Sequence, residues 1–166
     1  MVESEHFFGK IREYVKPGNK VAKLYYGDRL DILRGLSEIV GKQGRVYGVD
    51  ALNCARALPE ELSNLTIVES KIPPLPKEVE DLDAVVIREF LWTLYQGDGK
   101  LANNPETYKL IEEALKPKGH LIITENSPLD QNPDYKEFIE EGIQRYIPRL
   151  RKVYDRKEML IYQKED

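Results

Sequence analysis

Residues 20–50 read KVAKLYYGDRLDILRGLSEIVGKQGRVYGVD, and this stretch decides the expected fold. A short apolar run opens it, Gly27 marks a turn, and apolar residues then recur at helical spacing between Leu30 and Val40. Two glycines end that helix, and a second short apolar run leads to Asp50. A strand, a helix and a strand joined by short turns predict two parallel strands with a covering helix.

The same alternation extends to both ends of the chain. Further strands are expected at 65–69, 82–87 and 120–125, and helices at 3–16, at 51–62, from Asn104 and from Asn132. The last two strands, 152–154 and 159–162, are joined too tightly for a parallel crossover and are expected to be antiparallel. The sequence therefore predicts an α/β fold with a doubly wound, mostly parallel seven-stranded sheet, helices on both faces and an antiparallel C-terminal strand pair.

The composition is that of a compact chain. Its 166 residues are 41% hydrophobic and 33% charged, which excludes a disordered chain, and about 70% of the surface can be buried at this length. We expect one domain, residues 1–166, with the N-terminal helix as a short extension. No apolar run approaches the roughly 20 residues that span a bilayer, and the acidic N-terminus lacks the features of a signal peptide. A cytoplasmic protein without membrane contact is therefore expected.

The charge is unevenly distributed. The chain carries a formal net charge of −4, yet residues 144–164 hold seven basic and two acidic residues. The basic segment 145–157 has two interpretations, a solvated strand face or a surface that binds an acidic protein partner or RNA. The sequence does not indicate an oligomeric state.

Ligands of doubly wound sheets bind beyond the carboxyl ends of the strands, so the residues there decide the function. Three segments carry a resemblance to a known family. Residues 15–21 resemble the lead-in to its first strand, 44–50 its second strand ending in an acidic residue, and 115–125 the LKPGG segment of its fifth strand. From Val15 to the C-terminus, the chain resembles the class I S-adenosylmethionine (SAM) dependent methyltransferases.

This resemblance implies a Rossmann-like fold, SAM as the cofactor and a set of site residues. In such a site Asp50 holds the ribose hydroxyl groups, and Glu89 is the candidate general base, unless it only forms an ion pair with Arg88. The candidate cofactor-binding residues are Tyr25, Gly27, Asp28, Asp50, Ala51, Ser70, Lys71 and Arg88. No metal is expected, because neither histidine nor the single Cys54 has partners at metal-ligand spacing.

The glycine-rich loop of the family is altered in this chain. Its usual pattern is Asp-x-Gly-x-Gly-x-Gly, in which glycine lets the backbone approach the methionine part of SAM. Here Lys23 replaces the acid, Tyr25 and Arg29 replace two glycines, and only Gly27 remains. Lys71 stands where the family commonly has an acid that accepts from adenine. The two lysines either close the pocket by pairing with Asp50 or Glu69, or select an anionic ligand.

Two hypotheses from different classes follow. The first is a protein of methyltransferase fold with a degenerate SAM site, acting as a binding or partner subunit or as a non-standard methyltransferase. The second is an active SAM-dependent methyltransferase for a small molecule, RNA or protein, in which Glu89 or Glu125 positions the nucleophile. A nicotinamide-dependent oxidoreductase is disfavoured, because Gly-x-Gly-x-x-Gly is absent after the first strand.

Overall fold

The computed structural model describes residues 2–27, 29–51, 62–72, 74–88, 90, 104–125, 133–156 and 159–166. Its helices are α1 (Val2–Tyr14), α2 (Leu30–Val40), α4 (Pro105–Ala114) and α5 (Pro133–Tyr146). Its strands are β1 (Lys20–Leu24), β2 (Arg45–Asp50), β3 (Leu65–Glu69), β4 (Leu82–Arg88), β5 (Leu115–Thr124), β6 (Leu150–Arg156) and β7 (Met159–Lys164). The helix expected at 51–62 falls almost wholly outside the described residues.

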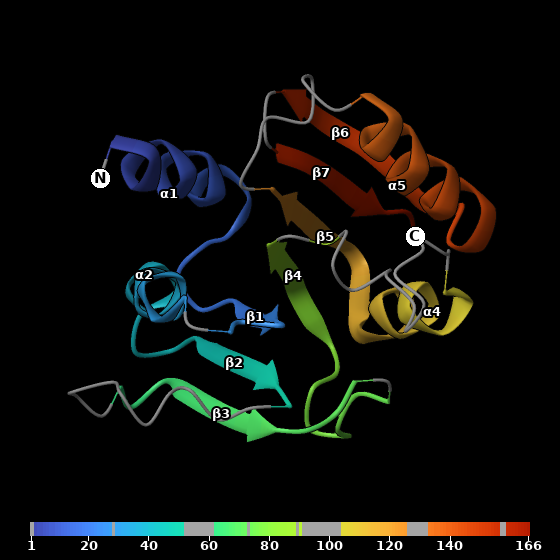
Figure 1. The fold of residues 1–166 in the computed structure, drawn as a ribbon. Coiled ribbons are helices and arrows are strands. Elements are labelled where there is room, and N and C mark those ends of the chain that lie inside the picture. The colour runs from blue at the N-terminus through green and yellow to red at the C-terminus, as the bar shows by residue number, and fades with distance from the viewer. Residues whose placement is uncertain are drawn as a thin grey trace.

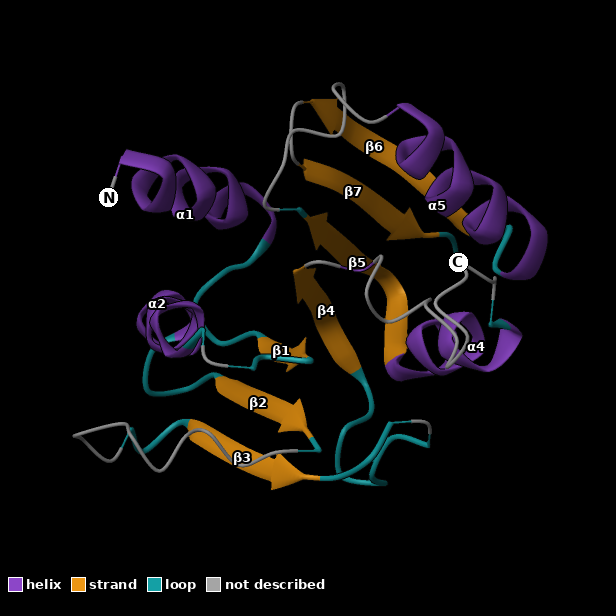
Figure 2. Cartoon of the chain, in the orientation of Figure 1, coloured by secondary structure: helices purple, strands orange, loops and turns teal. Residues whose placement is uncertain are grey.

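The strands form one seven-stranded sheet in the order β3-β2-β1-β4-β5-β7-β6. The pairs from β3 to β5 are parallel, whereas β7 runs antiparallel to both β5 and β6. Figure 1 shows β3 and β6 at the two edges of the sheet, and Figure 2 shows the helices on either side of it. The expected doubly wound, mostly parallel sheet with an antiparallel C-terminal pair is therefore confirmed.

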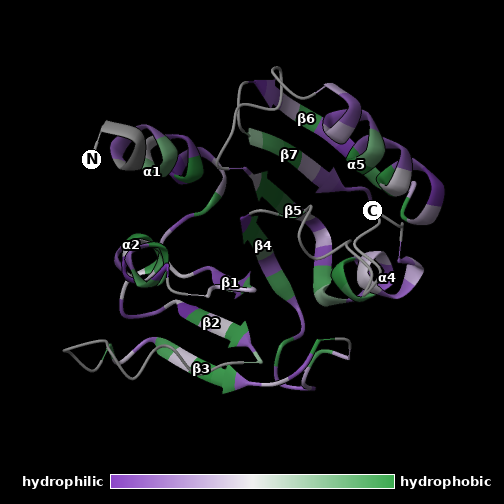
Figure 3. Cartoon of the chain, in the orientation of Figure 1, coloured by the Kyte–Doolittle hydropathy of each residue, from purple (hydrophilic) through white to green (hydrophobic). Residues whose placement is uncertain are grey.

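Each face of the sheet has its own hydrophobic core. Alternate residues of a strand point to opposite faces. Val85 and Ile87 of β4 lie in the cluster that α4 and α5 cover, and Ala84 and Val86 lie in the cluster that α1 and α2 cover. All four are fully buried, as the continuous apolar run of this strand predicts, and β4 is mainly green in Figure 3. This strand joins the two cores at the centre of the molecule.

Strand β5 begins earlier than the sequence indicates. A strand was expected from His120, but it extends from Leu115, which pairs with Leu82 before a register shift leads to the Ala84–His120 pair. The intervening Lys-Pro-Lys-Gly segment reads as a turn in the sequence, and it does contain a left-handed residue, Lys118, with φ 66°. Pairing at both ends nevertheless keeps the segment in the strand.

Helix α1 packs on α2 through an aromatic ring. Phe8 lies against Gly35, where an added Cβ atom would overlap the ring. The helix spans Val2–Tyr14, slightly displaced from the expected 3–16, and the amide of Val15 still donates to the carbonyl oxygen of Ile11 at 2.8 Å. Pro17 disfavours helical geometry at the residue before it, which accounts for the earlier end.

Candidate functional site

The loop after β1 is tied to the end of β2 by backbone hydrogen bonds. The amide of Tyr25 donates to the carbonyl oxygen of Val49 at 2.8 Å, and the amide of Gly27 donates to Asp50 Oδ2 at 2.9 Å. Tyr25 and Gly27 both have left-handed backbone conformations, with φ 51° and 53°. Glycine adopts this conformation without strain, but a bulky residue does not. The loop thus keeps a glycine-type conformation at a position that holds tyrosine.

The Tyr25 side chain extends from the end of β1 toward α4. It is half-buried, packs against the core on the α4 side of the sheet, and its hydroxyl group forms a hydrogen bond with Thr107 in the first turn of α4. Burial, together with the nearby negative charge of Asp50, raises the pKa of Tyr25 to about 12. The ring therefore connects the end of β1 to α4 as a neutral phenol.

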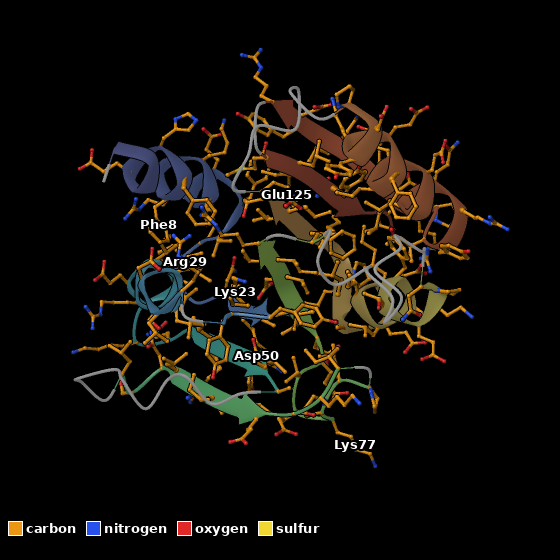
Figure 4. The ribbon with its side chains drawn as sticks, viewed as in Figure 1. Phe8, Lys23, Arg29, Asp50, Lys77 and Glu125 are labelled. Carbon is orange, nitrogen blue, oxygen red and sulfur yellow. The ribbon has the colours of Figure 1, made fainter. Side chains whose placement is uncertain are left out.

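Lys23 is the most unusual residue near this loop. Its side chain is fully buried, and its ammonium group donates to the carbonyl oxygens of Leu24 at 2.8 Å and Tyr25 at 3.3 Å. Burying a charge is costly unless hydrogen bonds compensate it, and these two carbonyl groups provide such bonds. Figure 4 shows Lys23 near the centre of the molecule, between Asp50 and Glu125.

Asp50 organises the ends of β2 and β3. Its carboxylate accepts from Gly27, and its carbonyl oxygen accepts from the amide of Ser70 at 2.9 Å. Ala51 directly follows β2, and Lys71 lies shortly after the end of β3. Both residues are exposed. Among the described residues Lys71 forms no ion pair with Asp50 or Glu69, so that part of the pocket-closure interpretation gains no support from this region.

A second set of polar residues lies at the ends of β4 and β5. Arg88 is half-buried and pairs in register with Thr124, whose side chain is 1% exposed. The Thr124 hydroxyl group has no hydrogen-bond partner among the described residues, and the next residue, Glu125, is buried at 7% exposure. Glu89 and Asp28, the candidate base and one candidate cofactor-binding residue, lie outside the described residues.

Helix α2 begins without a side-chain cap. The cap position is taken by Arg29, whose side chain makes no capping hydrogen bond. Its guanidinium group instead binds Asp31, with an Nε–Oδ1 distance of 3.0 Å. Arg29 is thus held at the exposed start of α2.

Three further observations complete the description of this region. A cavity of about 470 Å³ lies between the β3–β4 connection and α4, and its charged lining is mixed, with Lys77 and Lys109 beside Glu80, Glu106 and Glu113. Within the described ranges, no three His, Cys, Asp or Glu residues are grouped as a metal site would require. Over the same residues, no helix has the length and apolar character needed to cross a bilayer.

The fold is shared with solved structures over nearly the whole chain. Comparison with solved structures gives a SAM-dependent methyltransferase from Aquifex aeolicus, with a TM-score of 0.70 and 16% identity over 94% of this chain and 87% of that one. The chain has the class I SAM-dependent methyltransferase fold. At this identity the likeness establishes the fold alone.

Further solved structures with this methyltransferase fold also match the chain. One is a SAM-dependent O-methyltransferase from Thermotoga maritima, with a TM-score of 0.66 and 15% identity over 99% of this chain and 65% of that one. Another comes from a complex that contains the Haloferax volcanii Trm112 methyltransferase activator, with a TM-score of 0.64 and 16% identity over 99% and 91% of the two chains. No protein-family model and no curated protein sequence matches the chain.

The structure brings together only part of the expected site. Tyr25, Gly27, Asp50 and Ser70 are joined through the bonds of the β1 and β2 ends, while Arg88 lies beyond β1 on the neighbouring strand β4. Sequence reasoning missed Thr107, which reaches Tyr25 from a helix more than eighty residues later. No local pattern marks this threonine, because the contact is created by tertiary packing.

Proposed function

We propose that this chain is a methyltransferase-fold subunit that works by binding a partner and not by turning over SAM. The observation that carries the proposal is Tyr25, a half-buried tyrosine in left-handed geometry that spans from β1 to Thr107 of α4. In the family that the chain resembles, this position is a glycine, which lets the cofactor approach the backbone. A ring anchored at both ends takes that space.

The residues present fit one half of SAM better than the other. Asp50 stands at the end of β2, where a carboxylate suits ribose hydroxyl groups. The methionine half carries a sulfonium and an ammonium group, and it would meet the Tyr25 ring and two carbonyl oxygens already engaged by the Lys23 ammonium group. A cation near another cation is disfavoured by about 1–4 kcal/mol at intermediate dielectric.

Two features favour the runner-up, an active methyltransferase. The first is that the matched structures from Aquifex aeolicus and Thermotoga maritima are named as methyltransferases, and the second is the Gly27–Asp50 bond, which keeps the loop folded against β2. Under this alternative the chain transfers a methyl group from SAM to a small molecule, RNA or protein.

The partner-binding proposal is supported by analogy, because one matched structure contains an activator protein.

The test is calorimetric titration with SAM and with S-adenosylhomocysteine. The wild-type chain is expected to give no binding heat, and the double variant Tyr25→Gly with Arg29→Gly is expected to bind SAM, since the ring and the guanidinium group are removed. Lys118→Gly is the matched control, because it relieves another left-handed residue away from the site. It should leave the titration flat.

Three results would contradict the proposal. Micromolar binding of SAM by the wild-type chain would favour the active enzyme. An unchanged titration of the double variant, with an intact circular dichroism spectrum, would show that Tyr25 does not block the site. If Lys118→Gly bound SAM as well as the double variant does, relief of backbone strain alone would explain the effect of the double variant.

A further inference from the structure

Strand β6 forms one edge of the sheet and has no neighbour on its outer side among the described residues. An edge strand presents alternate backbone N–H and C=O groups to whatever lies beside it. Arg151, Lys152 and Val153 are exposed along this edge, and Val153 is one of the two exposed large hydrophobic residues in the described part of the chain. The edge therefore offers both hydrogen-bonding groups and an apolar contact.

The two faces beside this edge differ in charge. Residues opposite each other on β6 and β7 share a face. Lys152 and Asp155 pair with Tyr162 and Leu160, which belong to the core beneath α5. On that face the basic groups are balanced, because Asp155 binds both Lys136 and Lys152 at 2.7 Å.

The face toward α1 is not balanced. Arg151 and Arg156 pair with Gln163 and Met159, and Met159 belongs to the core beneath α1. Neither guanidinium group forms an ion pair within the described residues, and neither does that of Arg149, just before the strand. Helix α1 contacts this face through Lys10, whose ammonium group lies 4.5 Å from the ring centre of Tyr154. Arg151 and Arg156 thus remain on one side of the edge strand, with Arg149 in the turn just before it.

This charge pattern discriminates between occupants. A second copy of the chain that added its own β6 edge would bring arginine against arginine, which disfavours self-pairing through this edge. RNA is negatively charged along its whole length, and the α5 face beside the same strand offers it no excess of positive charge, because Lys136 and Lys152 are paired with Glu140 and Asp155. An extended segment with acidic side chains on one side avoids both conflicts, because alternate residues of a strand face the same way.

We propose that the β6 edge, residues 149–156, binds an acidic extended segment of a partner protein by strand addition. The partner's backbone pairs with the open edge, and carboxylates at every second position face Arg149, Arg151 and Arg156. Val153 supplies the apolar contact at the bulge between Lys152 and Tyr154. The inference rests on the proposed function, because it names the surface by which such a subunit would bind its partner.

The experiment uses fluorescence polarisation with the full chain and a labelled synthetic peptide in which glutamate alternates with valine. Binding is expected, and the affinity should fall as salt screens the charges. The double variant Arg151→Glu with Arg156→Glu should lose at least roughly tenfold in affinity. Lys42→Glu with Lys77→Glu is the matched control, since it makes the same charge change at exposed residues away from β6, as Figure 4 shows for Lys77.

Two further probes separate strand addition from charge alone. A peptide of the same sequence with alternate backbone amides methylated cannot pair with a strand edge, and it should not bind. A labelled single-stranded RNA should not bind either. Equal binding of the methylated peptide, preferential binding of the RNA, or no peptide binding by a correctly folded wild-type chain would each overturn the proposal. Self-association that the double variant abolishes would overturn it as well.

The SAM titration is scored separately, so the two proposals can fail independently. Peptide binding by a chain that also binds SAM would reject the non-catalytic role and leave the docking edge in place. A chain that binds neither SAM nor the peptide would reject the docking edge and leave the blocked site in place.

Discussion

The carbonyl oxygens of Leu24 and Tyr25 point to a group that donates hydrogen bonds, and Lys23 supplies it. An aspartate at this position would only accept hydrogen bonds. The end of β1 therefore has a polarity that suits a buried cation. The sequence revealed the substitution of the family's acid, but it did not reveal the partners of the lysine. Pairing with Asp50 or Glu69 was one interpretation, and the structure adds bonds from the lysine to two backbone carbonyl groups, which no sequence pattern indicates.

Lys23→Glu tests this polarity. The new carboxylate would lie buried beside two carbonyl oxygens, so the free energy of unfolding should fall by about 3 kcal/mol. Urea denaturation followed by circular dichroism measures the change. Lys42→Glu, at an exposed residue, should shift the same quantity by less than about 0.5 kcal/mol. A Lys23→Glu protein as stable as the wild type would mean that this loop accepts an acid, as the loop does in the family that the chain resembles.

At the scale of elements, sequence periodicity is a good guide where burial follows a simple pattern. The apolar run of β4 and the Asn-Pro start of α4 were both predicted, and the Asn104 side chain does accept a hydrogen bond from the amide of Glu106 at 3.0 Å. The start of β5 was placed too late, because a Pro-Lys-Gly segment has the composition of a turn. Only pairing with Leu82 across the sheet reveals that it belongs to a strand.

The packing of α1 on α2 depends on the absence of a side chain at Gly35. Gly35→Ala would place a Cβ atom inside the Phe8 ring and is expected to destabilise the chain by about 1–3 kcal/mol, with α1 becoming more sensitive to limited proteolysis. Gly9→Ala is the matched control, because a Cβ atom there meets nothing within 4 Å and alanine favours a helix. If Gly35→Ala is as stable as Gly9→Ala, the two helices are not held by this contact.

At the scale of the whole molecule, the sheet separates two cores but also joins them. Ile11 of α1 is fully buried in one core, and Ile143 of α5 is buried in the other. The sequence predicted the helices that carry both residues, at 3–16 and from Asn132. It could not assign them to a face, because the face that a helix covers is set by the order of the strands.

Because β4 contributes fully buried residues to both cores, loss of either core should destabilise the whole sheet. Ile11→Ala and Ile143→Ala are each expected to lower the free energy of unfolding by about 2–4 kcal/mol, within a single cooperative transition. Far-ultraviolet circular dichroism and tyrosine fluorescence should give the same midpoint in urea for the wild type and for both variants. Val153→Ala, at an exposed residue, should change the midpoint little. Two separated transitions, of which Ile11→Ala moves only one, would show that the cores unfold independently and that β4 does not couple them.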